Sequence, residues 1–192
     1  MNCDYRKYYY LENYIFNEVS EKYIKNGYIN YFDFFCIIIW KANRSKSKIA
    51  KRLLAKNYKD ISEAIKILTQ SIHQANNSRE RLKILIVEWG FRLPMASAIL
   101  TVLHPKDFTI YDIRVCEIIG NFKDIQNKTK FESIWEGYQK YIEAVKNAVS
   151  IDISLRDKDR FLWGKSFYDQ LKKDIRNNFK VYKKKGITIA CT

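Results

Sequence analysis

The chain contains very few of the residues that break helices. Only six glycines and two prolines occur in 192 residues. Sheet proteins need frequent tight turns, which are rich in Gly and Pro, whereas helix interiors tolerate neither residue well. Apolar residues instead recur three and four positions apart, as they do along one face of a helix. The sequence therefore predicts an all-α fold.

Helix boundaries can be placed from capping residues and from breaks in the apolar pattern. About nine helices are expected, over residues 4–24, 31–43, 47–54, 60–72, 78–88, 95–103, 113–119, 129–149 and 156–178. The predicted N-caps are Asp60, Ser78, Asp112 and Thr129. We expect a single domain over residues 1–178, divided into two lobes by a cleft near 40–44 and 105–114. A basic tail over residues 179–192 follows it.

The formal charge of +14 biases the chain toward polyanionic partners, with nucleic acid ahead of anionic lipid. A merely lysine-rich proteome would explain the charge as well, since Ile, Lys, Asn and Tyr are all abundant. The longest apolar run, Phe34–Trp40, is too short to span a bilayer. The first residues lack the basic-then-apolar pattern of a signal peptide. We therefore expect a cytoplasmic protein that does not contact membranes.

The cysteines and histidines indicate no cofactor. None of the four cysteines, Cys3, Cys36, Cys116 and Cys191, forms a C-x-x-C pair. A disulfide framework, a zinc site and an iron–sulfur cluster are thus not expected. Cys36 and Cys116 lie in apolar runs, which predicts buried thiols. The two histidines, His73 and His104, are too few and too far apart to predict a metal site.

The segment from Trp89 to Arg114 has the pattern of two helices joined by a tight turn. Gly90 interrupts one apolar pattern, and Pro94 suits the first turn of the next helix. Such a turn can direct backbone N–H groups and the positive end of a helix at a phosphate. Arg92 at the tip would add a charged contact. This segment predicts a grip on a nucleic acid backbone that does not depend on base sequence.

The same residues resemble a known family. Gly90-Phe91-Arg92-Leu93-Pro94-Met95-Ala96-Ser97-Ala98-Ile99-Leu100 resembles the hairpin and second helix of the helix–hairpin–helix DNA glycosylases, the endonuclease III superfamily. Phe108-Thr109-Ile110-Tyr111-Asp112-Ile113-Arg114-Val115 resembles the segment that carries the family's catalytic aspartate. Two further segments, Trp40-Lys41 with Arg44 and Arg156 to Trp163, resemble glycosylase-like bacterial proteins more weakly.

The resemblance implies an all-α, double-stranded-DNA-binding enzyme that removes a damaged or modified base, in base excision repair or in defence against modified DNA. Asp112 takes the catalytic role, and Lys41 is a candidate nucleophile. Nucleic acid contacts fall on Gly90, Phe91, Arg92, Leu93, Pro94, Arg44 and Arg114. Candidates for the base pocket or wedge are Trp40, Trp89, Tyr111 and Trp163. The resemblance also allows a monovalent cation at the hairpin, and it implies no obligate protein partner.

Two departures from the family pattern limit the expected chemistry. Arg92 stands where the family has its second hairpin glycine, and Pro94 stands where its lyase members have a catalytic lysine. The expected enzyme is therefore a monofunctional glycosylase. A helix–hairpin–helix protein that binds DNA without chemistry is the alternative, and an RNA-binding or partner-binding helical protein is a third. Asp112 could equally be an ordinary helix cap, and the tryptophans could be ordinary core residues.

Overall fold

The structure is a computed structural model that describes residues 4–177. Over these residues the chain is helical and has no strands, which confirms the predicted fold class. It has nine helices when directly continuous segments are counted together and the separate 3-10 helix at Lys123–Asn127 is left out. The predicted basic tail at 179–192 lies outside the described residues. No helix within residues 4–177 combines the length and the apolar character needed to cross a bilayer.

The first half of the chain forms a series of short and medium helices. They are α1 (Arg6–Tyr9), α2 (Leu11–Asn13), the π-helical η1 (Tyr14–Val19), α3 (Ser20–Asn26), α4 (Tyr31–Ala42), the 3-10 helix η2 (Asn43–Ser45), α5 (Lys46–Leu54) and α6 (Ile61–Gln74). Gly27 ends α3 at a φ of 73°, in the left-handed conformation that glycine adopts readily. Asp60 caps α6, as predicted, by accepting the backbone N–H of Glu63 at 2.8 Å.

The second half contains the segment in which the hairpin was predicted, and it continues through further helices. They are α7 (Ser78–Lys83), the π-helical η3 (Ile84–Glu88), α8 (Leu93–Leu103), α9 (Ile113–Ile119), the 3-10 helix η4 (Lys123–Asn127), α10 (Phe131–Ala148) and α11 (Leu155–Asn177). Two predicted caps were wrong. Asn77, not Ser78, caps α7, because its side chain accepts the Glu80 N–H. Lys130 precedes α10 without a side-chain cap, so Thr129 does not start that helix.

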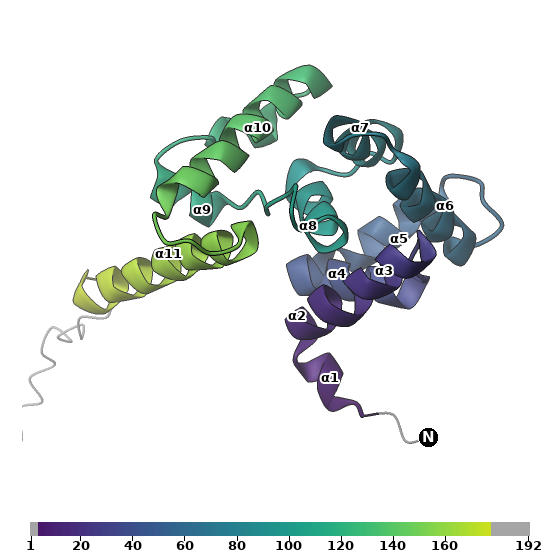
Figure 1. The fold of residues 1–192 in the computed structure, drawn as a ribbon, viewed down its shortest axis with the longest axis horizontal. Helices are drawn as coiled ribbons and strands as arrows, with labels where there is room; N and C mark the ends of the chain where they lie inside the picture. Colours follow the sequence, from purple (N-terminus) through teal and green to yellow (C-terminus); the bar gives the residue numbers. More distant parts are fainter. Residues whose placement is uncertain (1–3, 178–192) are drawn as a thin grey trace, which may run out of the picture.

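Helix α8 is the centre of the core. Every residue from Met95 to Leu103 is buried, so the helix is covered on all sides. It contacts α3, α4 and α7. In Figure 1, α8 lies between the N-terminal helices and the group formed by α9, α10 and α11. One continuous set of buried residues extends from Tyr14 to Leu162, so both groups share this core.

The chain crosses from α8 to α9 in an irregular segment, residues 104–112, that the core holds tightly. Phe108, Ile110 and Tyr111 are buried in it. The hydroxyls of Tyr138 and Tyr141 on α10 donate to the carbonyls of Thr109 and Ile110, at 2.5 and 2.8 Å. This anchoring fixes the position of Asp112, which is the first residue after the segment's buried part.

Candidate functional site

Lys41 and Asp112 form an ion pair at the edge of the core. Lys41 is near the end of α4, whose preceding turns, through Phe34 and Ile38, are buried. Its Nζ lies 2.7 Å from Oδ2 of Asp112. The other carboxylate oxygen, Oδ1, accepts the backbone N–H of Arg114 at 3.0 Å, so Asp112 is the predicted N-cap of α9. The pair therefore joins two helices whose residues are 71 positions apart in the sequence.

A pocket of about 330 Å³ opens beside this ion pair, within the size range of small-ligand sites. Its walls come from α2, α4, the 104–112 segment and α11. The lining residues are Glu12, Trp40, Lys41, Ile110, Asp112, Arg156, Asp159, Arg160 and Trp163. The Lys41 and Asp112 side chains are only 16% and 20% exposed. The pair is thus largely shielded from bulk water but accessible from the pocket.

Arg156 and Arg160 of α11 connect the pocket to the N-terminal helices. Arg156 donates to Glu12 at 2.6 Å and forms a second ion pair with Asp159 one turn along its own helix. Arg160 donates to the same Glu12 oxygen at 2.9 Å and to Asp157 at 2.7 Å. These bonds hold the first turns of α11 against α2. Three residues of the charge cluster seen in the sequence at 156–160, namely Arg156, Asp159 and Arg160, therefore form one wall of the pocket.

Asp159 is the most deeply buried acid of the pocket. Its side chain is 3% exposed. Burial raises the pKa of its carboxyl to about 6, and Asp112 adds to the rise, whereas Arg156 and Lys41 oppose it. Asp159 thus titrates much closer to neutrality than an ordinary aspartate does.

The charges that line the pocket balance. Three cations, Lys41, Arg156 and Arg160, face three acids, Glu12, Asp112 and Asp159. A site for a bare phosphate would have an excess of cations. The balance instead favours an uncharged polar group, for which both donors and acceptors are available.

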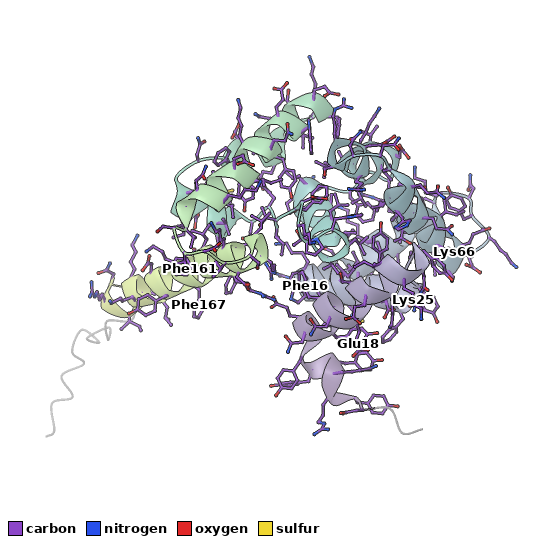
Figure 2. The ribbon with its side chains drawn as sticks, viewed as in Figure 1. Phe16, Glu18, Lys25, Lys66, Phe161 and Phe167 are labelled. Carbon is purple, nitrogen blue, oxygen red and sulfur yellow. The ribbon has the colours of Figure 1, made fainter. Side chains whose placement is uncertain are left out.

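Two tryptophans border the pocket in different settings. Trp40 is half-buried, contacts Phe16 edge-to-face at 5.5 Å, and has the Arg156 guanidinium 5.3 Å from its ring centre. Figure 2 places Phe16 next to the first turns of α11. Trp163 is 44% exposed, and the Arg114 guanidinium lies 5.6 Å from its ring centre. The pocket therefore has aromatic surface available to a planar ligand.

The segment predicted to be the hairpin forms a turn between η3 and α8. Gly90 has a φ of +67°, and the N–H of Phe91 donates to Leu85 O at 2.8 Å. Phe91 and Leu93 are buried, Pro94 is half-buried, and only Gly90 and Arg92 are exposed. Any ligand at this turn would meet its backbone and Arg92.

Helix α5 and the residues directly after it bring further cations to this turn. Arg52 donates to the carbonyl of Gly90, and Lys56 donates to the carbonyl of Glu88 at 2.5 Å. Neither residue was predicted. The Arg52 guanidinium therefore already hydrogen-bonds the Gly90 carbonyl, in the turn where the family resemblance allows a monovalent cation. Within residues 4–177, no group of acidic, histidine or cysteine side chains is arranged to hold a metal ion.

The remaining predicted residues do not line the pocket. Arg44 is exposed in η2, and Arg114 donates to Gln170 of α11 at 2.7 Å. Trp89 is buried in a stack on Tyr58. Tyr111 is buried, and its hydroxyl donates to Phe122 O at 2.7 Å. Trp89 and Tyr111 are therefore core residues that do not line the pocket.

No sequence pattern indicates Glu12, and the role of Asp159 within the Arg156–Arg160 cluster stays open from the sequence alone. Glu12 belongs to a short helix without any motif. Asp159 stands in a run of alternating charges typical of an exposed helix start. The two thiols predicted to be buried, Cys36 and Cys116, are both buried and free.

The comparisons with known proteins provide no assignment. No family model matches the chain, and neither a curated protein nor a solved structure does. The inference of function therefore depends on the geometry and chemistry of the site itself.

Proposed function

We propose that the chain binds DNA and removes a base from it, as a monofunctional DNA glycosylase-like enzyme whose reaction takes place in the Lys41–Asp112 pocket. The observation that carries this proposal is the 2.7 Å pair formed by Lys41 and Asp112 in a pocket bordered by Trp40 and Trp163. A carboxylate beside a pocket of base-like size, with aromatic walls and balanced charge, matches the needs of N-glycosidic cleavage.

The chemistry assigned to Asp112 follows from how the N-glycosidic bond breaks. As the bond to the base lengthens, positive charge develops on the sugar, and a carboxylate beside C1′ stabilises it. Asp112 would be that carboxylate, or it would accept a proton from the attacking water. The water oxygen bonds to C1′, the base leaves with the bonding electrons and gains a proton, and no covalent enzyme intermediate forms. The Lys41 ammonium keeps the carboxylate oriented between α4 and α9.

The grip on DNA is assigned to the exposed basic residues around the hairpin. Arg92 and the Gly90 backbone lie at its tip. Arg44 and Arg114, the other two predicted contact residues with a positive charge, follow the pocket residues Lys41 and Asp112 by three and two positions in the sequence. The overall charge of +14 supports a polyanionic partner. Phe91, Leu93 and Pro94 would support the turn from beneath.

Binding without chemistry is the second candidate, and one observation favours it. Both oxygens of Asp112 already have partners, the Lys41 ammonium and the Arg114 N–H. Capping α9 and anchoring α4 would explain the residue completely.

The experiment that decides between the candidates incubates the full chain with duplexes, and with single strands of the same sequences, that carry a broad panel of damaged and modified bases, and then cleaves abasic sites with alkali. Asp112→Asn is the informative variant, because asparagine caps a helix about as well as aspartate but carries no charge. Under the proposal it lowers the rate of base removal at least about 100-fold while the Tm is nearly unchanged. Glu117→Gln, an exposed acid on the same helix, is the matched control.

Absence of abasic product across the panel, or full activity of Asp112→Asn, rejects the enzymatic function. Salt-sensitive duplex binding in that case leaves the binding function standing.

A further inference from the structure

The distal half of α11 is the least covered helix surface of the described chain. After Ser166, no residue of this helix is buried. Figure 1 shows α11 extending past α9 and α10, away from the rest of the molecule. The large apolar side chains that it exposes are Phe161, Trp163, Phe167, Tyr168, Leu171 and Ile175. Exposed aromatic surface on this scale indicates a binding function.

Trp163 and Phe167 form an ordered aromatic pair on this surface. Their rings are parallel to within 2°, with centroids 6.0 Å apart. The Arg114 guanidinium lies over Trp163 and is itself held by Gln170. Phe167 is 49% exposed, and Figure 2 shows it projecting from α11. Because about half of Phe167 is exposed, part of its ring is accessible to another planar group.

The aromatic pair adjoins the pocket, because Trp163 is one of its two rings and also lines the pocket. Exposed cations also lie on the same helix: Lys165, which pairs with Asp169 at 2.6 Å, and Lys172 one turn beyond Tyr168. Flat aromatic faces flanked by cations fit a strand of unpaired nucleotides, whose bases stack while its phosphates meet the positive charges. Paired bases in a duplex do not offer their faces in this way.

We propose that the Arg114–Trp163–Phe167 stack is a platform for unpaired bases next to the nucleotide that enters the pocket. The preferred substrate is then single-stranded or locally opened nucleic acid, and a closed duplex binds less well. This inference rests on nucleic acid being the substrate of the proposed function, and it names the form of nucleic acid that the site accepts.

The test measures the binding of the full chain to a fluorescein-labelled oligothymidylate and to a blunt duplex of equal length by fluorescence anisotropy. Phe167→Leu removes the ring but keeps an apolar side chain, and it is expected to weaken single-strand binding about 10-fold. Affinity for the blunt duplex should stay the same. Phe167→Tyr restores stacking and should bind like the unmodified chain. Tyr9→Leu, at an exposed ring on α1, is the matched control and should change neither affinity.

Unchanged single-strand affinity of Phe167→Leu, or an equal loss for both probes, overturns the platform. So does concentration-dependent self-association in analytical ultracentrifugation that Phe167→Leu abolishes, because the face would then belong to a second copy of the chain. If bases are removed but Phe167→Leu does not selectively weaken single-strand binding, the platform is rejected and the enzymatic function stands. Selective single-strand binding without any base removal would reject the enzyme and keep the platform.

Discussion

Two lysine–carboxylate pairs in this molecule are alike in composition and opposite in setting. In the first, Asp33 accepts from Lys22 at 3.0 Å, from the Tyr14 hydroxyl at 2.5 Å and from Asn30 at 3.0 Å. Its side chain is 1% exposed. In the second, Asp112 binds Lys41 beside a pocket and is 20% exposed.

The contrast separates a structural pair from a candidate functional one. Asp33 is saturated with donors and sealed among α4, η1 and α3, so a ligand cannot reach it. Asp112 shares the same kind of partner but lies beside space large enough for a base. An ion pair alone therefore says little about function, and its access to a cavity says more.

The largest effect that would test this contrast is expected at the buried pair. Asp33→Ala leaves the buried Tyr14 hydroxyl without its acceptor and Lys22 without its counter-ion. We expect the free energy of unfolding to fall by about 4 kcal/mol, measured by urea denaturation. The Asp112→Asn variant in the same assay should lose much less. Comparable losses at the two aspartates would remove the distinction between the pairs.

Asp159 should give the next largest effect, through pH. Its folded pKa of about 6 lies above the ordinary value of 3.8, so the native state holds the proton more tightly than the unfolded state does. Its contribution to stability is therefore present below pH 4 and is lost as the pH rises through 6. Two pKa units correspond to about 3 kcal/mol. Asp159→Asn should remove this decline, as seen in unfolding curves recorded from pH 4 to pH 7.

The pKa of Asp157 is shifted in the opposite direction to that of Asp159, so Asp157 is a control for the pH dependence of stability. The Ser154 hydroxyl, followed by Arg160, lowers the pKa of its exposed carboxyl. Its stabilising contribution is therefore present above its ordinary pKa and is lost on acidification. Parallel stability curves for the original chain and Asp159→Asn would contradict the raised pKa of Asp159.

The two lysines should give the smallest effects on stability and the clearest division of roles. Lys22→Met removes a charged hydrogen bond to a buried acid and should cost about 1.5 kcal/mol without altering base removal. Lys41→Met leaves Asp112 capping α9 beside a pocket open to water, so it should cost only about 0.5 kcal/mol and should strongly reduce base removal. Stability is read from urea melts and activity from the alkali assay. The reverse pattern would exchange the assigned roles.

Local signals in the sequence predicted most of the fold. The scarcity of Gly and Pro, the apolar spacing and the caps at Asp60 and Asp112 each depend on neighbouring residues, and the structure agrees with them. Thr129 failed as a cap because α10 begins one residue later than predicted, after Lys130, which makes no side-chain cap. Ser78 failed because a neighbouring residue takes its place. Asn77, one residue earlier, supplies the acceptor for α7.

The site was less predictable, because its walls come from distant segments. Lys41 and Asp112 were candidates, but only the tertiary fold places Glu12 opposite Arg156 and Arg160. Asp33, an acid within an apolar run, carried a signal that was not used, since a buried acid needs partners nearby. Trp89 and Tyr111 illustrate the converse, because an aromatic residue near a motif packs into the core as readily as it lines a pocket.

The position of Lys41 at the end of a buried helix also has an evolutionary consequence. The folding of α4 depends on the residues before Lys41, and α9 needs only a capping side chain at Asp112. A single substitution at Lys41, or an exchange of Asp112 for asparagine, would therefore silence the proposed chemistry while the fold and the proposed DNA-binding surface are inherited intact. A lineage built on this scaffold could alternate between enzymes and pure binding proteins through one-step mutations.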